Sequence, residues 1–328
     1  MSKKKDKESP FYYGGQAVME GVMMRGKDSY CVSVRNPKGE IESRMGAIKS
    51  SKTLDTINKI PIIRGVVKLL TSLMLGVKIM KDSAEMAGLD EAADQSSKID
   101  MWLEKKFGEN LVKYVMVFSV ALSLVLSVGL FMVLPTWLSG FVAPLLGGNL
   151  WFLGVVEGLV RLVIFMAYLM LIAQFKDIKR VFQYHGAEHK AINCYEAGDA
   201  LTISNVARHN RLHKRCGTSF LLFVMLISMI FFLFVRTDVM WMRVLSRILF
   251  VPFIAGVSFE VIKWAGISKS PIVAIISFPG MMLQKITTKE PDESQIEVAI
   301  RALENAIQNP EIIDNTIDHA KDNEEVDA

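Results

Sequence analysis

Two histidines and a glutamate near the middle of the chain have the spacing of a metal-dependent hydrolytic site. The stretch HGAEH places His185, Glu188 and His189 at positions i, i+3 and i+4, so a helix would carry all three on one face. Imidazoles one turn apart can bind a divalent ion, and an adjacent carboxylate can deprotonate a water bound to it, as in the inverted zinc-protease pattern H-x-x-E-H. We predict His185 and His189 as metal ligands and Glu188 as the catalytic base.

More candidate ligands follow closely in the sequence. Glu196 lies on the same predicted helical face, and His209, His213 and Cys216 follow on a second predicted helix that folds back as a hairpin. We predict His213 and Glu196 as further metal ligands, with His209 and Cys216 as additional candidates. The alternative is a solvated polar hairpin, which explains the lysines and arginines of this segment. It does not explain why four of the five histidines gather there.

The composition places this site in a membrane protein. Of the 328 residues, 51% are apolar, and the mean hydropathy is +0.30. Three cysteines are too few for a disulfide framework, and a net charge of +4 without a basic stripe argues against nucleic acid as a partner. We predict an all-α membrane protein, a polytopic bundle of about four spans with a small N-terminal β element. The apolar windows are 114–135, 150–172, 217–235 and 244–266.

Lysines and arginines set the predicted orientation. They are frequent before the first span and in 173–216, whereas 136–149 has no charged residue. The positive-inside rule therefore places both termini and the histidine segment in the cytoplasm, with the protein in the cytoplasmic membrane. The bilayer is then its first partner.

The chain divides into seven predicted parts. They are a basic tail (1–10), a Gly-rich and β element (11–60), amphipathic interfacial helices (61–113), two spans (114–172), the cytoplasmic histidine hairpin (173–216), two spans with a short apolar segment (217–290), and an amphipathic helix with an acidic, disordered tail (291–328). Alternating side chains around an Asn-Pro-Lys-Gly turn predict a β-hairpin in the second part.

Two of these parts have alternative interpretations. The apolar run 271–284 is too short to span and is interrupted by Pro279, so it is either re-entrant or interfacial, or a bent helix packed on the bundle. The block GGQAVMEGVMMRG at 14–26 is either a loop over the histidine site or a Gly-rich hairpin. In the loop, Glu20 would serve as an acid or ligand and Arg25 would hold an anionic group. In the hairpin, Glu20 and Arg25 would form an ion pair.

Charged residues inside the predicted spans are a second group of functional candidates. Glu157 and Arg161 are four residues apart, which suits an ion pair along one helix, and Glu260 lies in the fourth window. A transporter would build its pathway from these three residues. The alternative is a self-paired helix face buried between spans.

Three separated blocks resemble the signature blocks of the YqhQ-type family of bacterial membrane proteins. They are YGGQAVMEGVMMRG (13–26), YHGAEHKAINCYE (184–196) and RLHKRCGTSFLL (211–222). The resemblance implies a multi-span inner-membrane protein whose domain of unknown function is described as a predicted metal-dependent enzyme. Such proteins usually carry proline where this chain has Lys214.

These observations predict a metal-dependent hydrolase at the cytoplasmic membrane face. Its cofactor would be a divalent Zn, Mn or Fe ion, and its substrate a membrane protein segment or a lipid. One alternative is a non-enzymatic scaffold, in which any metal only braces the hairpin and an apolar stripe in 292–308 recruits a partner. The other alternative is a transporter. The stripe consists of Ile296, Ile300, Leu303 and Ile307.

Overall fold

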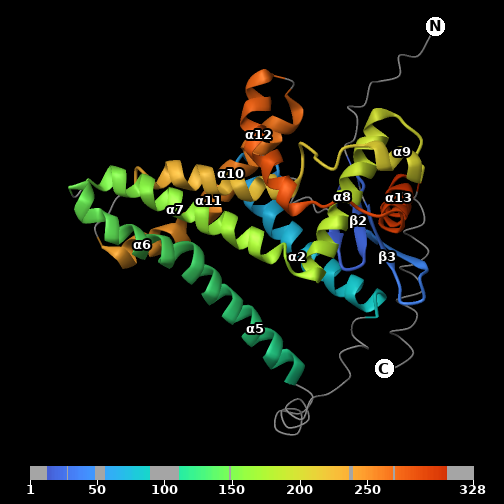
Figure 1. The fold of residues 1–328 in the computed structure, drawn as a ribbon, viewed down its shortest axis with the longest axis horizontal. Coiled ribbons are helices and arrows are strands. Elements are labelled where there is room, and N and C mark those ends of the chain that lie inside the picture. Colours follow the sequence, from blue (N-terminus) through green and yellow to red (C-terminus); the bar gives the residue numbers. More distant parts are fainter. Residues whose placement is uncertain are drawn as a thin grey trace.

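The computed structural model combines a long helical bundle with a small sheet at one end (Figure 1). The predicted tails at 1–10 and beyond 308 lie outside the described residues, as does 89–110 of the predicted interfacial region. The structure describes residues 13–27, 29–48, 56–88, 111–147, 149–235, 239–268 and 270–308.

Four antiparallel strands form the sheet in the order β1-β2-β3-β4. The predicted hairpin is confirmed, because β3 and β4 flank a turn in which Oδ1 of Asn36 accepts hydrogen bonds from the N–H groups of Lys38 and Glu40. The Gly-rich block is a hairpin as well, and it forms β1 and β2. The strands are β1 Gly14–Val18, β2 Gly21–Arg25, β3 Ser29–Arg35 and β4 Ile41–Ala47.

Helices account for most of the remaining described residues. The bundle contains α2 Ile63–Met86, α6 Leu134–Val142, α7 Leu150–Ile172, α10 Gly217–Phe232, α11 Met240–Ile267 and α12 Pro271–Thr287. α5 Leu111–Val128 extends away from the bundle (Figure 1). A π-helical turn, η2 Gly129–Val133, joins α5 to α6, and a 3-10 turn, η3 Ala143–Leu146, continues α6. Beside the sheet lie α8 Lys176–Ala197, α9 Ile203–Arg208 and α13 Glu293–Gln308.

Three helical stretches are long and apolar enough to cross a membrane, which suggests membrane association. They are Val117–Leu145, Leu150–Ile172 and Trp241–Ala265. The predicted span at 217–235 forms only the 16-residue helix α10. At 1.5 Å per residue such a helix is about 24 Å long, shorter than a hydrocarbon core of roughly 30 Å. The fourth predicted window instead lies in the long helix α11, which continues through Pro252.

The apolar run at 271–284 is not broken by its proline. It forms the single helix α12, which contains Pro279. The next residue, Gly280, faces α10, where an added Cβ would lie 2.8 Å from Cβ of Ser219. Because glycine permits this close approach, α12 packs on α10, which agrees with the packed-helix alternative rather than with a broken segment.

α2 packs along α11. A Cβ on Gly65 would lie 2.9 Å from Cα of Gly256, so the two backbones are nearly in contact. Glu260 lies one turn after Gly256 on α11 and forms an ion pair with Arg64 of α2. Glu260 is therefore not part of the group formed by Glu157 and Arg161. The opposite face of α2 exposes apolar side chains, a pattern that suits the predicted interfacial position. They are Leu70, Leu73, Met74 and Val77.

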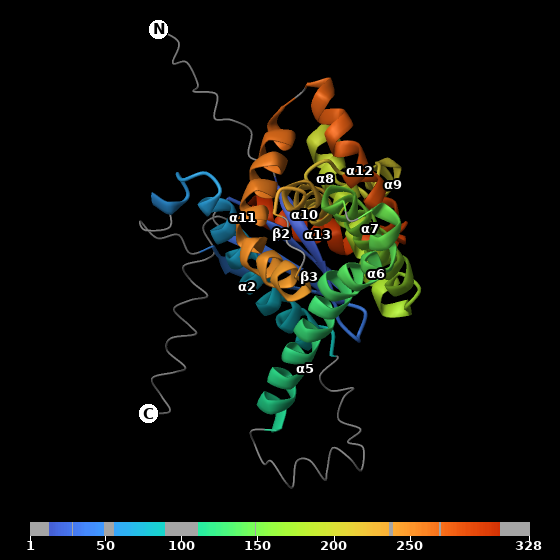
Figure 2. The same ribbon diagram turned by 90° about the vertical axis from the view of Figure 1, so that its left-hand side faces the viewer.

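The sheet is covered on both faces (Figure 2). Met23 and Val32 pack toward α2, whereas the neighbouring Met24 and Cys31 pack toward α8 and α13. The predicted amphipathic helix is confirmed as α13, and its stripe is buried in this core, with Leu303 fully buried. The stripe therefore stabilises the fold and leaves no apolar face of α13 for the predicted partner.

Candidate metal centre

The predicted helix over the HGAEH motif forms and buries its three polar side chains. α8 carries His185, Glu188 and His189 on one face, where they are 8%, 4% and 1% exposed. The helix is followed by Gly198, whose φ of 82° is the left-handed conformation that glycine adopts at helix C-termini. Helical spacing alone therefore brings these three groups together.

Both histidines are held in the tautomer that a metal ligand needs. Nδ1 of His185 lies 2.9 Å from the carbonyl oxygen of Thr287, and Nδ1 of His189 lies 2.6 Å from that of Arg211. A carbonyl can only accept, so each Nδ1 donates its hydrogen and each Nε2 keeps a lone pair. Hydrogen bonds of this kind orient the histidines of known metal sites.

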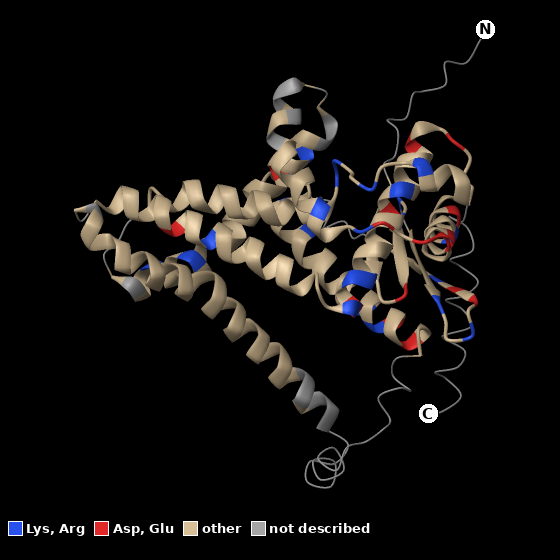
Figure 3. Cartoon of the chain, viewed as in Figure 1, with Lys and Arg blue, Asp and Glu red and all other residues tan. Residues whose placement is uncertain are grey.

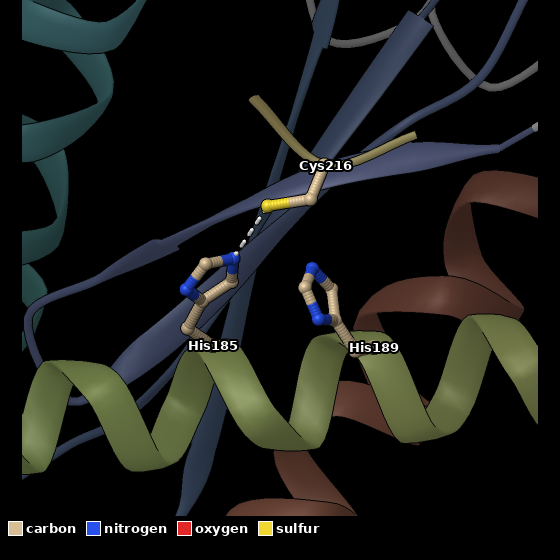
Figure 4. A group of neighbouring side chains, drawn as sticks. All are labelled: His185, His189 and Cys216. Carbon is tan, nitrogen blue, oxygen red and sulfur yellow. Dashed lines mark hydrogen bonds between the residues drawn. The ribbon is translucent and has the colours of Figure 1, made fainter. Parts of the chain in front are cut away.

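Cys216 brings a third ligand atom to the two imidazoles (Figure 4). Its Sγ lies 3.1 Å from Nε2 of His185, and the ligand atoms of His185, His189 and Cys216 all lie within 4.8 Å of one another. Cys216 is the N-cap of α10, where Sγ accepts a hydrogen bond from the N–H of Thr218. Burial raises the pKa of the thiol, but His189 and Thr218 outweigh burial, so this pKa lies below its usual value. A lower pKa favours the thiolate, which is the metal-binding form.

Two polar atoms of this group are buried without a partner among the described residues. Nε2 of His189 and Oε2 of Glu188 make no hydrogen bond within the described part of the chain. Burial lowers the pKa of His189 and raises that of Glu188 to about 8, so both groups are neutral at pH 7 in the absence of a cation. Orphaned buried acceptors are rare in proteins. Two imidazoles, a thiolate and a nearby carboxylate are donors that suit a zinc-like ion, so these residues fit a divalent cation.

β1 covers the carboxyl group of Glu188. The backbone N–H of Gly15 donates a hydrogen bond to Glu188, and a Cβ on Gly15 would lie 2.9 Å from Cδ of that residue. The Gly-rich block therefore does lie over the histidine site. It contributes a bare backbone there instead of a polar side chain, which sequence spacing could not show.

The segment after α9 differs from the prediction. α9 ends at Arg208, so no second helix carries His209 and His213, because the chain turns extended at His209. Polar side chains hold the extended segment. Nδ2 of Asn193 donates to the carbonyl of Asn210 at 2.6 Å, and Gln284 exchanges two hydrogen bonds of 2.8 Å with the backbone of His213. Sequence reasoning missed both positioning residues; the only signal for Gln284 was a polar residue ending an apolar run.

Two predicted ligands lie next to the group but not in it. His213 is buried, and its ring centroid lies 5.7 Å from that of His189. Its Nε2 lies 3.6 Å from Glu196, whose carboxylate forms an ion pair with Arg215. Burial, followed by the charge of Arg215, lowers the pKa of His213 to about 4, so its imidazole is neutral at pH 7.

The other candidates lie elsewhere. His209 hydrogen-bonds Asp199 at 2.9 Å on the surface. Glu20 forms an ion pair with Arg180 of α8, so the predicted pair with Arg25 is wrong, and Arg25 is exposed at the end of β2. Spacing along the chain could not identify Arg180 as the partner of Glu20, because Arg180 is distant in the sequence and only the packing of α8 on β1 brings it close.

The charges in the bundle form a larger group than predicted. The pair of Glu157 and Arg161 is confirmed, with a distance of 3.0 Å. Arg243 and Arg247 of α11 also approach Glu157. The sequence held both arginines, but their meeting with Glu157 depends on how α7 and α11 pack.

The fold and site define a class of helical protein with candidate membrane spans and a buried His–Cys group against a small sheet. The comparisons agree on a family. The family described as "Protein of unknown function (DUF1385)" matches residues 60–309. The chain is also 37% identical over 294 residues to "Uncharacterized protein YqhQ" of Bacillus subtilis (strain 168), which covers 89% of this chain and 91% of that protein. No solved structure matches. The chain belongs to the DUF1385 family.

Proposed function

We propose that this protein is a metal-dependent hydrolase of the cytoplasmic membrane, with its site at the cytoplasmic face. The observation that carries the proposal is the convergence of His185, His189 and Cys216 within 4.8 Å, beside a glutamate with an unpartnered oxygen. The packing of this region leaves two of its polar atoms, Nε2 of His189 and Oε2 of Glu188, without a partner among the described residues. A cation would satisfy them.

His185, His189 and Cys216 would hold the ion, and zinc is favoured because it accepts mixed nitrogen and sulfur ligands. When bound, a divalent ion supplies a Lewis acid that lowers the pKa of a bound water. Thr287 and Arg211 keep the two imidazoles oriented through their carbonyls. Glu188 would accept a proton from the water, because a nearby cation lowers the carboxyl pKa from its raised value and leaves the group ionised.

The place of the site in the chain points to a membrane-derived substrate. α7 is a candidate span, and only 173–175 separate its last residue from the first residue of α8. The histidines therefore lie a few helical turns beyond the end of the bundle. With the sheet end in the cytoplasm, a protein segment or lipid that leaves the bilayer could reach them without a long path.

Elemental mass spectrometry on tag-free protein tests this proposal. We expect near one equivalent of metal in the wild type, and its loss in His185→Ala, His189→Ala and Cys216→Ala. His209→Ala is the matched control, because this histidine is nearby but hydrogen-bonds Asp199 on the surface. Peptide and phospholipid probes then compare the wild type with Glu188→Gln, which should keep the metal and lose hydrolysis. Wild-type protein that is folded and metal-free after supplementation with zinc would contradict the proposal.

A thiol nucleophile is the second candidate, and the contact of 3.1 Å between Cys216 Sγ and His185 Nε2 favours it. The lowered pKa of Cys216 agrees with such a pair. Alkylation separates the two hypotheses. A metal ligand is protected from iodoacetamide by zinc and exposed by chelation, whereas a catalytic thiolate reacts with or without the chelator.

A further inference from the structure

A group of arginines lies inside the bundle at the end away from the sheet, where charged bands interrupt otherwise uncharged helices (Figure 3). Arg161 of α7 and both Arg243 and Arg247 of α11 surround the single carboxylate of Glu157. We refer to these four residues as the arginine cluster. Glu157 is 2% exposed, and Arg161 and Arg247 are 7% and 6% exposed.

The arginine cluster has more positive than negative charge. Three guanidinium groups against one carboxylate leave a net charge of +2 among the described residues. Arg236 and Asp238, which lie between α10 and α11 in the sequence, are outside that part of the chain, and their formal charges cancel. Burying unbalanced charge in an apolar bundle is strongly unfavourable, even after local relaxation. A structural ion pair alone would need only one arginine.

The vacant hydrogen-bonding groups in the cluster are donors. Nε of Arg243 and Nε of Arg247 are buried without a partner among the described residues. In Arg161, by comparison, Nε does have a partner, the carbonyl oxygen of Phe131 at 3.0 Å, and Nη2 lies 3.0 Å from Glu157. The excess charge and the vacant N–H groups therefore coincide on the two arginines of α11.

A recess opens beside these two arginines. Its walls include Glu157, Arg243 and Arg247 as well as apolar side chains from the start of α7 and the end of α10. Apolar walls around a charged base suit an amphiphilic ligand with one anionic group. Glu157 lies seven residues after the first residue of α7, about 10 Å along the helix, so it lies in the outer part of the hydrocarbon core if α7 spans. Long arginine side chains at this depth can extend toward the headgroups.

We propose that the recess binds a phosphate-type anion, with Arg243 and Arg247 as its ligands. The phosphate can belong to the headgroup of an anionic phospholipid or can be a free ion. Thr136 and Glu157 already engage both Nη atoms of Arg247, so the free donor of that guanidinium is its Nε. The vacant Nε–H groups of Arg243 and Arg247 can each donate a charge-assisted hydrogen bond to one phosphate. Bound here, the anion lowers the net charge of the cluster, by one unit as a phosphodiester headgroup and by up to two units as free phosphate. The site is independent of the candidate metal centre.

Thermal-shift titration of the detergent-solubilised full chain tests the proposal with three probes: dihexanoyl-phosphatidylglycerol, dihexanoyl-phosphatidylcholine and inorganic phosphate. Phosphatidylglycerol should raise Tm, and phosphatidylcholine should not. The dissociation constant should increase roughly tenfold or more in Arg243→Gln and Arg247→Gln, the effect of losing one hydrogen bond to a charged group. Arg301→Gln is the control, because Arg301 is exposed on α13.

The outcomes separate the two sources of the phosphate. If inorganic phosphate stabilises as well as phosphatidylglycerol with the same variant dependence, the ligand is the free anion; if only the lipid acts, it is the headgroup. Stabilisation that is independent of both arginines, or none by any anion, overturns the proposal. Phenylglyoxal labelling of the wild type needs no variant: the effective anion should protect Arg243 and Arg247 but not Arg301, and equal labelling would contradict the site.

Discussion

The two buried polar clusters of this protein are opposites in their unused hydrogen-bonding capacity. Beside the sheet, the vacant atoms are Nε2 of His189, which is an acceptor, and Oε2 of Glu188, which is an acceptor when the carboxyl is ionised. In the bundle, they are donors, Nε of Arg243 and of Arg247. The first cluster can become neutral by moving protons, whereas the second carries guanidinium groups that keep their charge. Vacant acceptors suit a cation and vacant donors suit an anion, so each cluster indicates the sign of its ligand.

The largest change in stability should come from replacing Glu157, the one acidic residue of the arginine cluster. Glu157→Gln leaves the buried Arg161 and Arg247 and the partly exposed Arg243 without a counter-charge. Removing one partner of a buried ion pair destabilises a protein by roughly 3–5 kcal/mol. We expect a strongly reduced Tm in detergent. Val163→Ala, an exposed position on the same helix, is the control for α7. An unchanged Tm for Glu157→Gln would show that the cluster is already neutralised by other means.

The stability of the region around the candidate metal centre should depend on acidic pH, because its buried imidazoles are neutral and can take up protons. The pKa of His213 is about 4 in the folded protein and 6.5 in the reference state, so the unfolded chain takes up the proton first. The contribution of His213 to stability is therefore complete above pH 6.5 and is lost as the pH falls to about 4. It amounts to at most about 3 kcal/mol. In metal-free protein, His213→Gln should flatten the decrease in Tm between these pH values, whereas His209→Gln should not.

The close contact between β1 and Glu188 gives the next prediction. A Cβ at Gly15 would lie 2.5 Å from the carbonyl oxygen of Met23 and 2.9 Å from Glu188. Gly15→Ala should destabilise the protein by roughly 1–3 kcal/mol and displace Glu188, which lowers any hydrolytic activity. The adjacent Gly14 has no atom within 4 Å of such a Cβ, so Gly14→Ala is a matched control. Equal Tm values for the two variants would show that β1 is not seated on Glu188.

The smallest change in stability should come from replacing Glu188, the acidic residue of the candidate metal centre. The pKa of Glu188 is raised from 4.5 to about 8 by burial, so its carboxyl is protonated at pH 6 and an amide replaces it closely. Glu188→Gln should change stability there by less than about 1 kcal/mol. A raised pKa favours folding at low pH, and this contribution is lost as the pH rises toward 8. The variant should therefore gain Tm relative to the wild type at pH 8. A large loss at pH 6 would mean that Glu188 is ionised and paired.

The local periodicity of the sequence was enough to predict several helices and strands of this protein. The i, i+3, i+4 spacing placed His185, Glu188 and His189 on one face of α8, and the apolar stripe predicted α13. Alternation around a turn predicted β3 and β4. These features follow from the fixed geometry of helices and strands, which depends on neighbours in the chain.

Only the tertiary structure decided which distant groups meet. Cys216 joined the two histidines because Gln284 and Asn193 fix the extended segment before α10, while Glu196 turned to Arg215 instead. The stripe of α13 was visible in the sequence, but its burial against the sheet was not. The cluster around Glu157 likewise depends on the packing of α7 against α11. Periodicity predicts which face of a helix or strand a side chain lies on. The element that packs against that face is set by contacts between residues far apart in the chain, and a single sequence carries no local signal for those contacts.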